Sequence, residues 1–400
     1  MRDKGRGVGL RLFIHDFGRF AFTLDMARWL AAQGHTVLYC WCDDIEVPGA
    51  RPAPRPDDPP GLHLKPLSLG AAMPKYQPLR RWRYEGRYGR LSAAAVAAFR
   101  PDRVISAHAP PRLQAALLAS ARRAGCGFVA WIGDLMSVVA ARALPRMLPL
   151  AGHWLHVLVR HWEFRALAAA DRVIAVSSDF VAPCLANGVA LERIAVLPSW
   201  EPLASGAPES GWLAAHDLVG RRLVIYAGTL GLKHDPALLA DLAAALADRP
   251  EVRVVVATQG LGRAWLEQAR RERDLANLVL LDYQHGDAFA AFLAAAEVAV
   301  ALLEPYAASG CVPLKVWSYL AAGCPVVAAI PLGNPAAAAV AASAAGLVVG
   351  ADGLAAGVAA LLDDPARRLA CGAAGRRYAE QAFSLADLGP RFFDLVEAVP

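Results

Sequence analysis

One stretch of the chain decides its fold: Leu223-Val224-Ile225-Tyr226-Ala227-Gly228-Thr229-Leu230-Gly231-Leu232-Lys233-His234-Asp235-Pro236. Its first five residues are apolar and predict a short strand buried in a parallel sheet. Gly228 and Gly231 then predict a turn, because a residue without Cβ tolerates unusual backbone angles and close approaches. Asp235 is a good N-cap, and Pro236 suits the first position of the helix predicted from the apolar run that follows. The stretch therefore predicts a strand, a tight turn and a helix in succession.

We refer to residues 228–235 as the lysine turn. A helix that begins beyond the carboxyl end of a strand directs free N–H groups and the positive end of its dipole outward. Lys233 adds a full positive charge at that place. Together these groups predict a site for a diphosphate. An ordinary strand-to-helix turn with a surface lysine explains the same residues, because glycine turns precede helices throughout α/β proteins.

Apolar strand-like runs and helix-like segments alternate along the rest of the chain. The strands predicted in the first half are residues 8–14, 36–41, 103–106, 128–132, 172–176 and 194–197; those in the second half are 223–227, 253–257, 278–281, 298–302, 325–329 and 346–349. This alternation predicts an α/β protein of two doubly wound, Rossmann-like domains that face each other across a cleft. The expected boundaries are a first domain over 1–200, a Pro- and Gly-rich linker over 201–220, a second domain over 221–383, and a last helix over 384–400 that packs back on the first domain.

Composition favours a folded, helix-rich protein, since 56% of the residues are hydrophobic. Residues 1–9 are basic and glycine-rich, which does not resemble a secretory signal. The longest apolar region, residues 319–349, is interrupted by glycines and prolines and does not predict a membrane-spanning helix. The seven cysteines have no metal-ligand spacing, and reduced thiols in a cytosolic protein explain them most simply.

Positive charge is concentrated in the first half of the chain. Residues 1–200 contain 26 basic and 15 acidic residues, a net charge of +11, whereas residues 201–400 have a net charge of −6. Within residues 75–100, the basic segment, seven basic residues and the interleaved Tyr76, Trp82, Tyr84 and Tyr88 accompany one acid, Glu85. A solvated loop followed by a helix explains this pattern. The functional alternative is a surface that docks on anionic lipid headgroups through Lys75, Arg80, Arg81, Trp82, Arg83 and Arg87. Nucleic acid is not expected as a partner, because no nucleic-acid-binding motif accompanies the segment.

Residues 144–167 have a second ambiguous pattern, rich in Leu, Val and Trp with interspersed Arg and His. They fit a pair of core helices, and they fit equally an amphipathic element that lies on a bilayer.

Three positions in the first half follow predicted strands, where open α/β sheets bind ligands. Gly18 lies in the turn after the first strand, and His108 and Asp134 lie just beyond two later strands. A dinucleotide fingerprint is not supported, because no Gly-x-Gly-x-x-Gly occurs there. A histidine at such a position is either a satisfied structural residue or part of a site, and the neighbouring Asp134 keeps both alternatives open.

Several of these strings together resemble the family 4 retaining glycosyltransferases of GT-B fold. The lysine turn resembles their donor-binding turn, and further matches are Gly34-His35-Thr36-Val37, Arg100-Pro101-Asp102, Leu197-Pro198-Ser199-Trp200, Val312-Pro313-Leu314-Lys315 and Leu320-Ala321-Ala322-Gly323-Cys324-Pro325-Val326-Val327. The closest resemblance is to the bacterial branch that builds colanic acid, O-antigen and other exopolysaccharides, which includes fucosyl- and N-acetylfucosaminyl-transferases.

The resemblance implies roles for individual residues. Lys233 matches the basic residue that neutralises the donor diphosphate, whereas Thr229 stands near the place of an arginine that is usual in the family. Gly18 matches the turn that approaches the phosphates from the opposite domain. Tyr283 and Gln284 match the segment that reads the nucleobase. Asp134, His108 and Lys233 are accordingly the expected catalytic residues.

One departure from the family pattern concerns two glutamates, eight residues apart, that bind the donor sugar and ribose in many members. Gly310 and Ser318 stand at those positions, and Glu304 lies upstream, where it either compensates or simply ends a strand. The complete set expected to bind the donor is Gly18, Gly228, Thr229, Gly231, Lys233, Tyr283, Gln284, Glu304, Gly310, Cys311, Val312, Pro313, Lys315 and Ser318.

The implied reaction moves a sugar from a UDP- or GDP-sugar to an acceptor linked to polyprenyl diphosphate, with retention by front-face attack. No cofactor and no metal ion are expected, since a lysine and a helix terminus can stabilise the leaving diphosphate and no Asp-x-Asp pair is present as a ligand. The expected location is the inner face of the cytoplasmic membrane, as a peripheral protein. The alternatives are a sugar-nucleotide 2-epimerase and a catalytically silent nucleotide-binding scaffold of a polysaccharide assembly complex.

Overall fold

A computed structural model describes residues 9–47, 51–201 and 210–400 and divides the chain into two compact units. Unit 1 comprises Met1–Ser199 and Ser384–Pro400, and unit 2 comprises Trp200–Phe383. The first eight residues of the chain and residues 202–209 of the expected linker lie outside the described residues.

Within the described residues, unit 1 contains a seven-stranded sheet in the order β3-β2-β1-β4-β5-β6-β7, with all neighbours parallel. The strands are β1 (Arg11–Asp16), β2 (Thr36–Cys42), β3 (Leu62–Leu67), β4 (Arg103–Ala107), β5 (Gly127–Ile132), β6 (Arg172–Ala175) and β7 (Ile194–Val196). The central strands are buried along almost their whole length, as their continuous apolar runs require.

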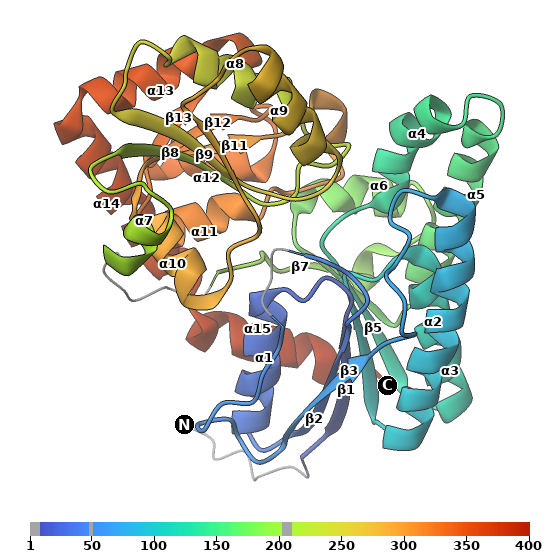
Figure 1. The fold of residues 1–400 in the computed structure, drawn as a ribbon. Helices are drawn as coiled ribbons and strands as arrows, with labels where there is room; N and C mark the ends of the chain where they lie inside the picture. Colours follow the sequence, from blue (N-terminus) through green and yellow to red (C-terminus); the bar gives the residue numbers. More distant parts are fainter. Residues whose placement is uncertain (1–8, 48–50, 202–209) are drawn as a thin grey trace. The chain divides into compact units, whose positions relative to one another are not determined.

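Helices cover both faces of this sheet (Figure 1). They are α1 (Ala21–Ala32), α2 (Pro78–Phe99), α3 (Pro111–Ala124), α4 (Met136–Met147), α5 (Gly152–Ala168), α6 (Val181–Leu185) and α15 (Leu385–Glu397), with short 3-10 turns at Ser178–Phe180 and Leu191–Arg193. α2 packs along α3, and α3 packs on α5. The last helix, α15, packs on α1 of the same unit, where Gly389 leaves room for the Trp29 ring and Phe393 stacks on His35 at 4.5 Å between ring centroids.

The structure of unit 1 differs from the sequence prediction at two places. β3 was not predicted, because residues 62–67 alternate Leu with His and Lys and contain a proline, a pattern that suits an edge strand. The first strand was predicted to end at residue 14, but His15 and Asp16 are the buried last residues of β1. Residues 144–167 belong to two helices, since α4 ends at Met147 and α5 begins at Gly152, which agrees with the helix pair given as one of two alternatives.

Unit 2 contains a six-stranded parallel sheet within the described residues, in the order β10-β9-β8-β11-β12-β13. Its strands are β8 (Arg222–Ala227), β9 (Val252–Ala257), β10 (Leu278–Leu281), β11 (Ala296–Leu302), β12 (Val326–Ala329) and β13 (Gly346–Val348). Its helices are α7 (Ser210–Ala215), α8 (Ala237–Ala245), α9 (Leu261–Glu272), α10 (Gly286–Ala294), α11 (Lys315–Ala322), α12 (Pro335–Ser343), α13 (Leu354–Asp363) and α14 (Pro365–Ala382), with 3-10 turns at Pro305–Ala307 and Ala351–Gly353. α7 occupies part of the segment expected to be linker.

One core of unit 2 is built from the apolar residues of the strands and of α8, α9 and α13, and it includes Val224, Leu239, Val254, Leu266 and Val358. In both units the strand order reverses beside the first strand, between β1 and β4 and between β8 and β11. The prediction of two Rossmann-like parallel sheets is therefore confirmed. Ligands bind such sheets beyond the carboxyl ends of the strands at this reversal.

Candidate functional site

The lysine turn lies at the reversal point of unit 2 and is held at several places. After β8, Gly228 has φ +118°, a left-handed conformation that strongly favours glycine. Leu230 donates its N–H to the Thr258 hydroxyl at 3.1 Å, and Glu304 donates its N–H to the Lys233 carbonyl at 2.9 Å. The Tyr306 hydroxyl also donates to the Leu232 carbonyl. The turn is thus attached to the segments that follow both neighbouring strands.

The helix after the turn begins at Ala237, one residue later than predicted. Pro236 nevertheless has helical backbone angles, φ −68° and ψ −21°. The Asp235 carboxylate accepts the Ala237 N–H at 2.9 Å, so it satisfies one of the free amides at the start of α8. The expected order of strand, glycine turn and capped helix is confirmed.

Two lysines meet at this turn. The Lys233 ammonium lies 3.2 Å from the Cys311 sulfur. Lys315 is the first residue of α11, and its ammonium contacts the Tyr226 hydroxyl and lies 3.8 Å from the Tyr226 ring centroid. A Cβ placed on Gly228 would be 3.2 Å from Lys315 Cε and 3.6 Å from its Nζ. Burial lowers the pKa of Lys315 from 10.5 to about 7.

The two residues expected to read the nucleobase, Tyr283 and Gln284, have different side-chain partners. The Tyr283 hydroxyl is 2.5 Å from the Thr229 hydroxyl, so Tyr283 lies against the lysine turn. The Gln284 side-chain oxygen accepts the Trp212 indole N–H from α7 at 3.0 Å, and its amide nitrogen donates to the Asp282 carbonyl. Tyr283 and Thr229 are therefore brought together at the turn, whereas the Gln284 side chain has a structural partner.

The segment from Glu304 to Ser318 approaches the lysine turn from β11 and α11. Glu304 is half-buried and contributes a backbone bond, and Gly310, Cys311, Val312 and Pro313 are buried. Gly231 is half-buried within the turn, and Ser318 is buried inside α11. Asn334, which was not predicted, donates its side-chain amide to the Cys311 carbonyl at 2.8 Å and the Ala308 carbonyl at 2.9 Å. Its only signal in the sequence is the Asn-Pro pair at the start of α12.

In unit 1, the turn after β1 is organised by Asp16, another residue that was not predicted. Its carboxylate accepts the Gly18 N–H at 3.0 Å, the Phe20 N–H at 2.7 Å and the Tyr39 hydroxyl at 2.9 Å. Burial raises the pKa of Asp16 to about 7, against the opposing effect of these bonds. The amide of Gly18, expected to face phosphate, thus donates to this carboxylate.

His108 is half-buried, and both of its ring nitrogens are shielded from solvent behind aromatic rings. Ring centroids of Phe20, Phe22 and Trp131 lie 4.6, 5.2 and 5.7 Å from that of His108. Neither ring nitrogen has a hydrogen-bond partner among the described residues, and burial lowers the pKa of His108 to about 3. Asp134, by contrast, is exposed. Both follow neighbouring strands of the sheet, as predicted, but one is a neutral imidazole with shielded nitrogens and the other an exposed carboxylate.

Near Asp134, Glu163 of α5 has a role that was not predicted from the sequence. Its carboxylate accepts the Met136 N–H at 2.6 Å and the Ser137 N–H at 3.0 Å, which caps the start of α4. Burial raises the pKa of Glu163 despite these bonds. The residue was overlooked because its partners lie 26 and 27 residues away in the chain.

The basic segment forms α2 and the loop before it. Arg80, Arg83 and Arg87 are exposed at helical spacing, and Lys75 is exposed in the loop. Arg81 instead pairs with Glu85 at 2.8 Å. Trp82 is half-buried, with the Arg112 guanidinium 4.3 Å from its ring centroid and the Trp162 ring of α5 at 6.0 Å. Arg81 and Trp82, both expected at a lipid surface, therefore make contacts within the unit.

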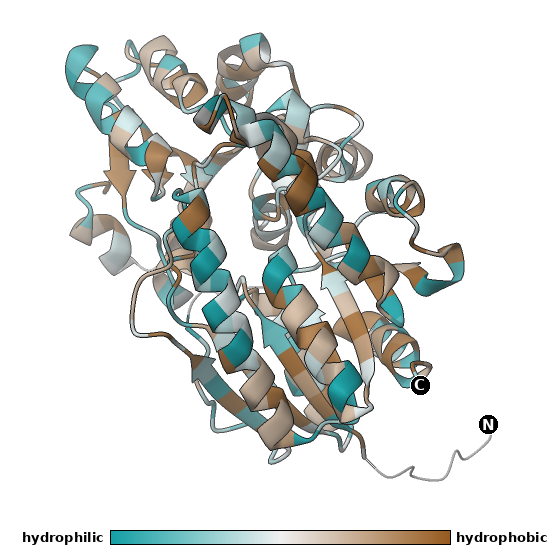
Figure 2. Cartoon of the chain, turned by 90° about the vertical axis from the view of Figure 1, so that its right-hand side faces the viewer, coloured by the Kyte–Doolittle hydropathy of each residue, from teal (hydrophilic) through white to brown (hydrophobic). Residues whose placement is uncertain are grey.

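The hairpin of α4 and α5 exposes apolar side chains. Leu150 is 96% and Trp154 is 77% exposed, and Val157 and Leu158 are also exposed. Beside them, Val157, Phe164, Arg160, His161 and Arg165 line a shallow groove. Figure 2, which views the right-hand side of Figure 1, shows hydrophilic and hydrophobic residues mixed along the helices there. The exposed surface of this hairpin combines apolar and basic groups.

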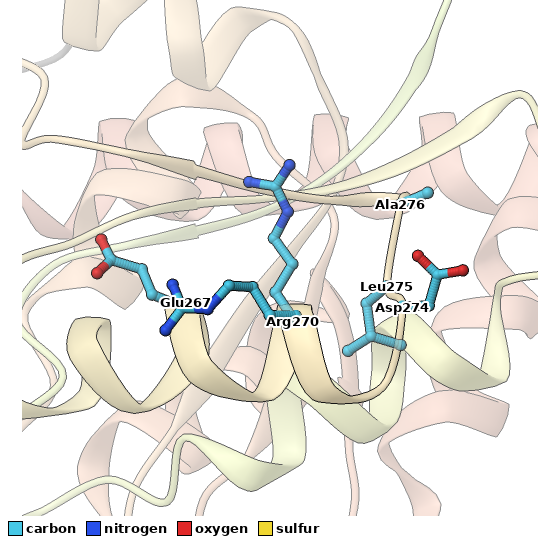
Figure 3. A pocket seen from close by; sticks show the side chains of 6 residues that line it. Glu267, Arg270, Asp274, Leu275 and Ala276 are labelled. Carbon is cyan, nitrogen blue, oxygen red and sulfur yellow. The ribbon is translucent and has the colours of Figure 1, made fainter.

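The remaining candidate features, among them a surface hollow and the cysteines, do not form a functional site. The hollow in Figure 3 is lined by Glu267, Arg270, Arg271, Asp274, Leu275 and Ala276. It lies just before β10 begins, at the amino edge of the sheet, opposite the edge that binds ligands. In the described part of the chain, no group of three or more His, Cys, Asp or Glu side chains is arranged to hold a metal ion, and no helix is long and apolar enough to cross a membrane. All seven cysteines are buried, and none of them forms a disulfide bond.

Comparison with known proteins agrees with this geometry. Residues 21–200 match the family described as "Glycosyl transferase 4-like domain", and residues 221–364 match "Glycosyl transferases group 1". A relative in Escherichia coli (strain K12), WcaI, named as a glycosyl transferase of colanic acid biosynthesis, is 26% identical over 320 residues, which cover 76% of this chain and 77% of that protein.

Solved structures share the fold over nearly the whole chain. Anabaena HepE, solved in complex with UDP-glucose, has a TM-score of 0.69 at 15% identity and covers 97% of this chain and 100% of its own. WaaG, described as a glycosyltransferase involved in lipopolysaccharide biosynthesis, has a TM-score of 0.67 at 15% identity with coverage of 97% and 100%.

The fold and the site together define two Rossmann-like units, the second with a glycine turn and two lysines at its reversal point. The chain belongs to the glycosyltransferases of GT-B fold, with a glycosyl transferase 4-like first half and a group 1 second half. The expected enzyme class is confirmed.

Proposed function

We propose that this glycosyltransferase moves a sugar from a nucleoside-diphosphate sugar to a lipid-linked saccharide during assembly of a bacterial surface polysaccharide. The observation that carries the proposal is the convergence of Lys233 and Lys315 on the glycine turn before α8. Two ammonium groups and the free amides of a helix start form a site for a diphosphate. HepE, solved with UDP-glucose, and WcaI, named for colanic acid biosynthesis, support the donor class and the pathway class.

The proposed chemistry is departure of the nucleoside diphosphate from the anomeric carbon. Negative charge grows on the diphosphate in the transition state, and positive groups already in place stabilise it without reorganising. The lysines supply the charge that a metal ion would otherwise bring, so the proposed enzyme needs no metal. Retention of configuration, by attack from the leaving-group side, is proposed from the family resemblance.

The acceptor is proposed to be a sugar on polyprenyl diphosphate, held at the inner face of the cytoplasmic membrane. Support comes from the exposed arginines of α2 and the exposed apolar residues of the α4–α5 hairpin. Each of the two helices α2 and α5 contains one acid, Glu85 and Glu163, and both acids are buried. Such a surface attracts anionic lipid headgroups and inserts apolar side chains among them.

A thermal-shift screen of nucleotide sugars, followed by transfer assays, tests the proposal. A single UDP- or GDP-sugar should raise the unfolding temperature, and its sugar should be transferred to a lipid-linked acceptor but not released quickly to water without one. Epimerisation of the soluble donor alone would support the epimerase instead. Nucleotide binding without transfer, hydrolysis or epimerisation would support the silent scaffold.

A further inference from the structure

Arg19 lies in the turn after β1 of unit 1, beside Gly18, and only 6% of the residue is exposed. Its φ of +54° is in the left-handed region, a strained conformation for a residue with a Cβ. The guanidinium donates from Nη2 to the Ile45 carbonyl at 2.9 Å, but neither Nε nor Nη1 donates a hydrogen bond to another described residue. Leaving buried donors of a charged group unused is unfavourable. The position therefore suits an arginine whose remaining donors bind a ligand.

The carboxylate beside Arg19 is shared with a second arginine. Asp43 Oδ1 lies 3.7 Å from Arg19 Nη1 and 3.2 Å from Arg51 Nε. The same oxygen accepts the indole N–H of Trp41 at 3.3 Å. Asp43 is half-buried and Arg51 is exposed, so this group of side chains is open to solvent on that side. Two guanidinium groups that share one carboxylate have a net positive charge, which attracts a further anion.

This group of side chains lies at the ligand-binding edge of the sheet. Arg19 follows β1, and Asp43 follows β2 directly, so both lie beyond the carboxyl ends of strands, beside the reversal between β1 and β4. In the turn after β1, the Asp16 carboxylate already accepts the N–H groups of Gly18 and Phe20. Those two amides are therefore not available to a ligand. The Arg19 guanidinium is the positive group that this turn supplies.

A structural role for Arg19 would be to tie the turn after β1 to the segment after β2. The bond to Ile45 is enough for that role, which explains neither the two unused donors nor the strained backbone. We infer that Arg19 and Arg51 bind a phosphate group of the lipid-linked acceptor, in the place that the Asp43 carboxylate occupies in the free protein. The inference rests on the proposed function, in which the acceptor carries a diphosphate, and it names the residues that bind this diphosphate. Arginine suits that role because its N–H groups donate charge-assisted hydrogen bonds to phosphate oxygens.

Isothermal titration calorimetry of the intact protein with farnesyl diphosphate, a short polyprenyl diphosphate, tests this inference. Farnesol has the same chain without the phosphates, and UDP and GDP have a diphosphate without the chain. Arg19→Met should weaken the binding of farnesyl diphosphate by about 10- to 100-fold, the range expected for lost hydrogen bonds to a charged group, and leave nucleotide binding unchanged. Asp43→Asn should strengthen the binding of farnesyl diphosphate, because it removes the competing carboxylate. Arg123→Met, which removes an exposed arginine at the end of α3, on the opposite edge of the sheet, should match the wild type.

Opposite effects of Arg19→Met and Asp43→Asn support the inference, because breaking a merely structural ion pair from either side would not strengthen binding. The inference is overturned if the wild type does not bind farnesyl diphosphate, or binds farnesol equally well, or if Arg19→Met retains wild-type affinity. Weaker nucleotide binding in Arg19→Met, with farnesyl diphosphate unaffected, would assign the arginine to the donor and overturn its assignment to the acceptor. None of these results removes the proposed function, which fails if the wild type binds neither nucleotide and transfers no sugar. Should Arg19→Met not fold, Asp43→Asn decides alone, since unchanged or weaker binding of farnesyl diphosphate contradicts the inference.

Discussion

The Lys233 ammonium lies 3.2 Å from the sulfur of Cys311, a residue 78 positions later in the chain. The Lys233 carbonyl accepts the Glu304 N–H at 2.9 Å, so both ends of this lysine are positioned by the segment after β11. The lysine turn follows β8 and is held in place by the segment that follows the adjacent strand β11.

This contact predicts different results for its two members. Lys233→Met removes the charge that stabilises the leaving diphosphate and should lower kcat/KM by roughly 100- to 1,000-fold. Cys311→Ala removes only a neighbour of the ammonium and should lower kcat/KM by about tenfold or less. Steady-state transfer assays measure both, with Lys65→Met as the charge-removal control. An equal loss in Cys311→Ala and Lys233→Met would show that the thiol, and not the charge, is what the reaction needs.

The positive φ of Gly228 predicts that adding a single methyl group there lowers the stability of the protein. Gly228→Ala forces alanine into φ +118° and places its Cβ 3.2 Å from Lys315 Cε. The free energy of unfolding should fall by about 1–2 kcal/mol, and nucleotide affinity should fall as Lys315 is displaced. Urea denaturation measures the first effect and calorimetry the second. Gly333→Ala is the matched control, because its Cβ would meet nothing within 4 Å and its φ is not positive. Equal stability of the two variants would contradict the prediction.

Burial of His108 predicts a loss of stability in acid. Its pKa is about 3 in the folded protein and near 6.5 when unfolded, so the folded state favours the neutral ring. The stabilisation is complete above pH 6.5 and is lost as the pH falls toward 3, by about 2 kcal/mol at pH 5. His108→Phe should remove this part of the dependence, while His15, whose pKa is also lowered to about 3, keeps its own.

Urea denaturation of wild type and His108→Phe at pH 8 and pH 5 measures the difference. Asp16 contributes in the opposite sense, because its raised pKa costs stability as the pH rises from 3.8 toward 7, but it is present in both proteins. An identical pH dependence in the two proteins would mean that His108 is charged when folded. A transfer assay of the same variant reports separately whether the imidazole takes part in catalysis.

The arginines of α2 predict binding to anionic membranes. Arg83→Glu combined with Arg87→Glu reverses two exposed charges and should abolish flotation with vesicles that contain an anionic lipid at low salt. Arg270→Glu combined with Arg271→Glu, on the exposed end of α9, changes the net charge equally and should leave flotation intact. Loss of flotation in both double variants would indicate a response to net charge alone and not a docking surface on α2.

Much of the fold could be read from local patterns. The apolar runs that form β8, β9 and β11 predict buried strands whatever their neighbours in the sheet are. The glycines and Asp235 specify the lysine turn through their own backbone preferences. β3 was not predicted because an edge strand is partly exposed to water, and its sequence therefore mixes apolar and polar residues. Asp16 and Glu163 were missed because a buried carboxylate is recognisable only by the distant amides that it accepts.

The sequence by itself determined two α/β halves and a turn suited to phosphate, because strand periodicity, glycine conformation and helix capping act over a few residues. The tertiary structure alone decided what surrounds that turn. Lys315 contacts Tyr226, 89 residues earlier, because the sheet places β11 beside β8 and so brings the start of α11 to the end of β8. His108 is neutral for the same kind of reason, since the rings that exclude water from it come from β5 and from the segment around the start of α1.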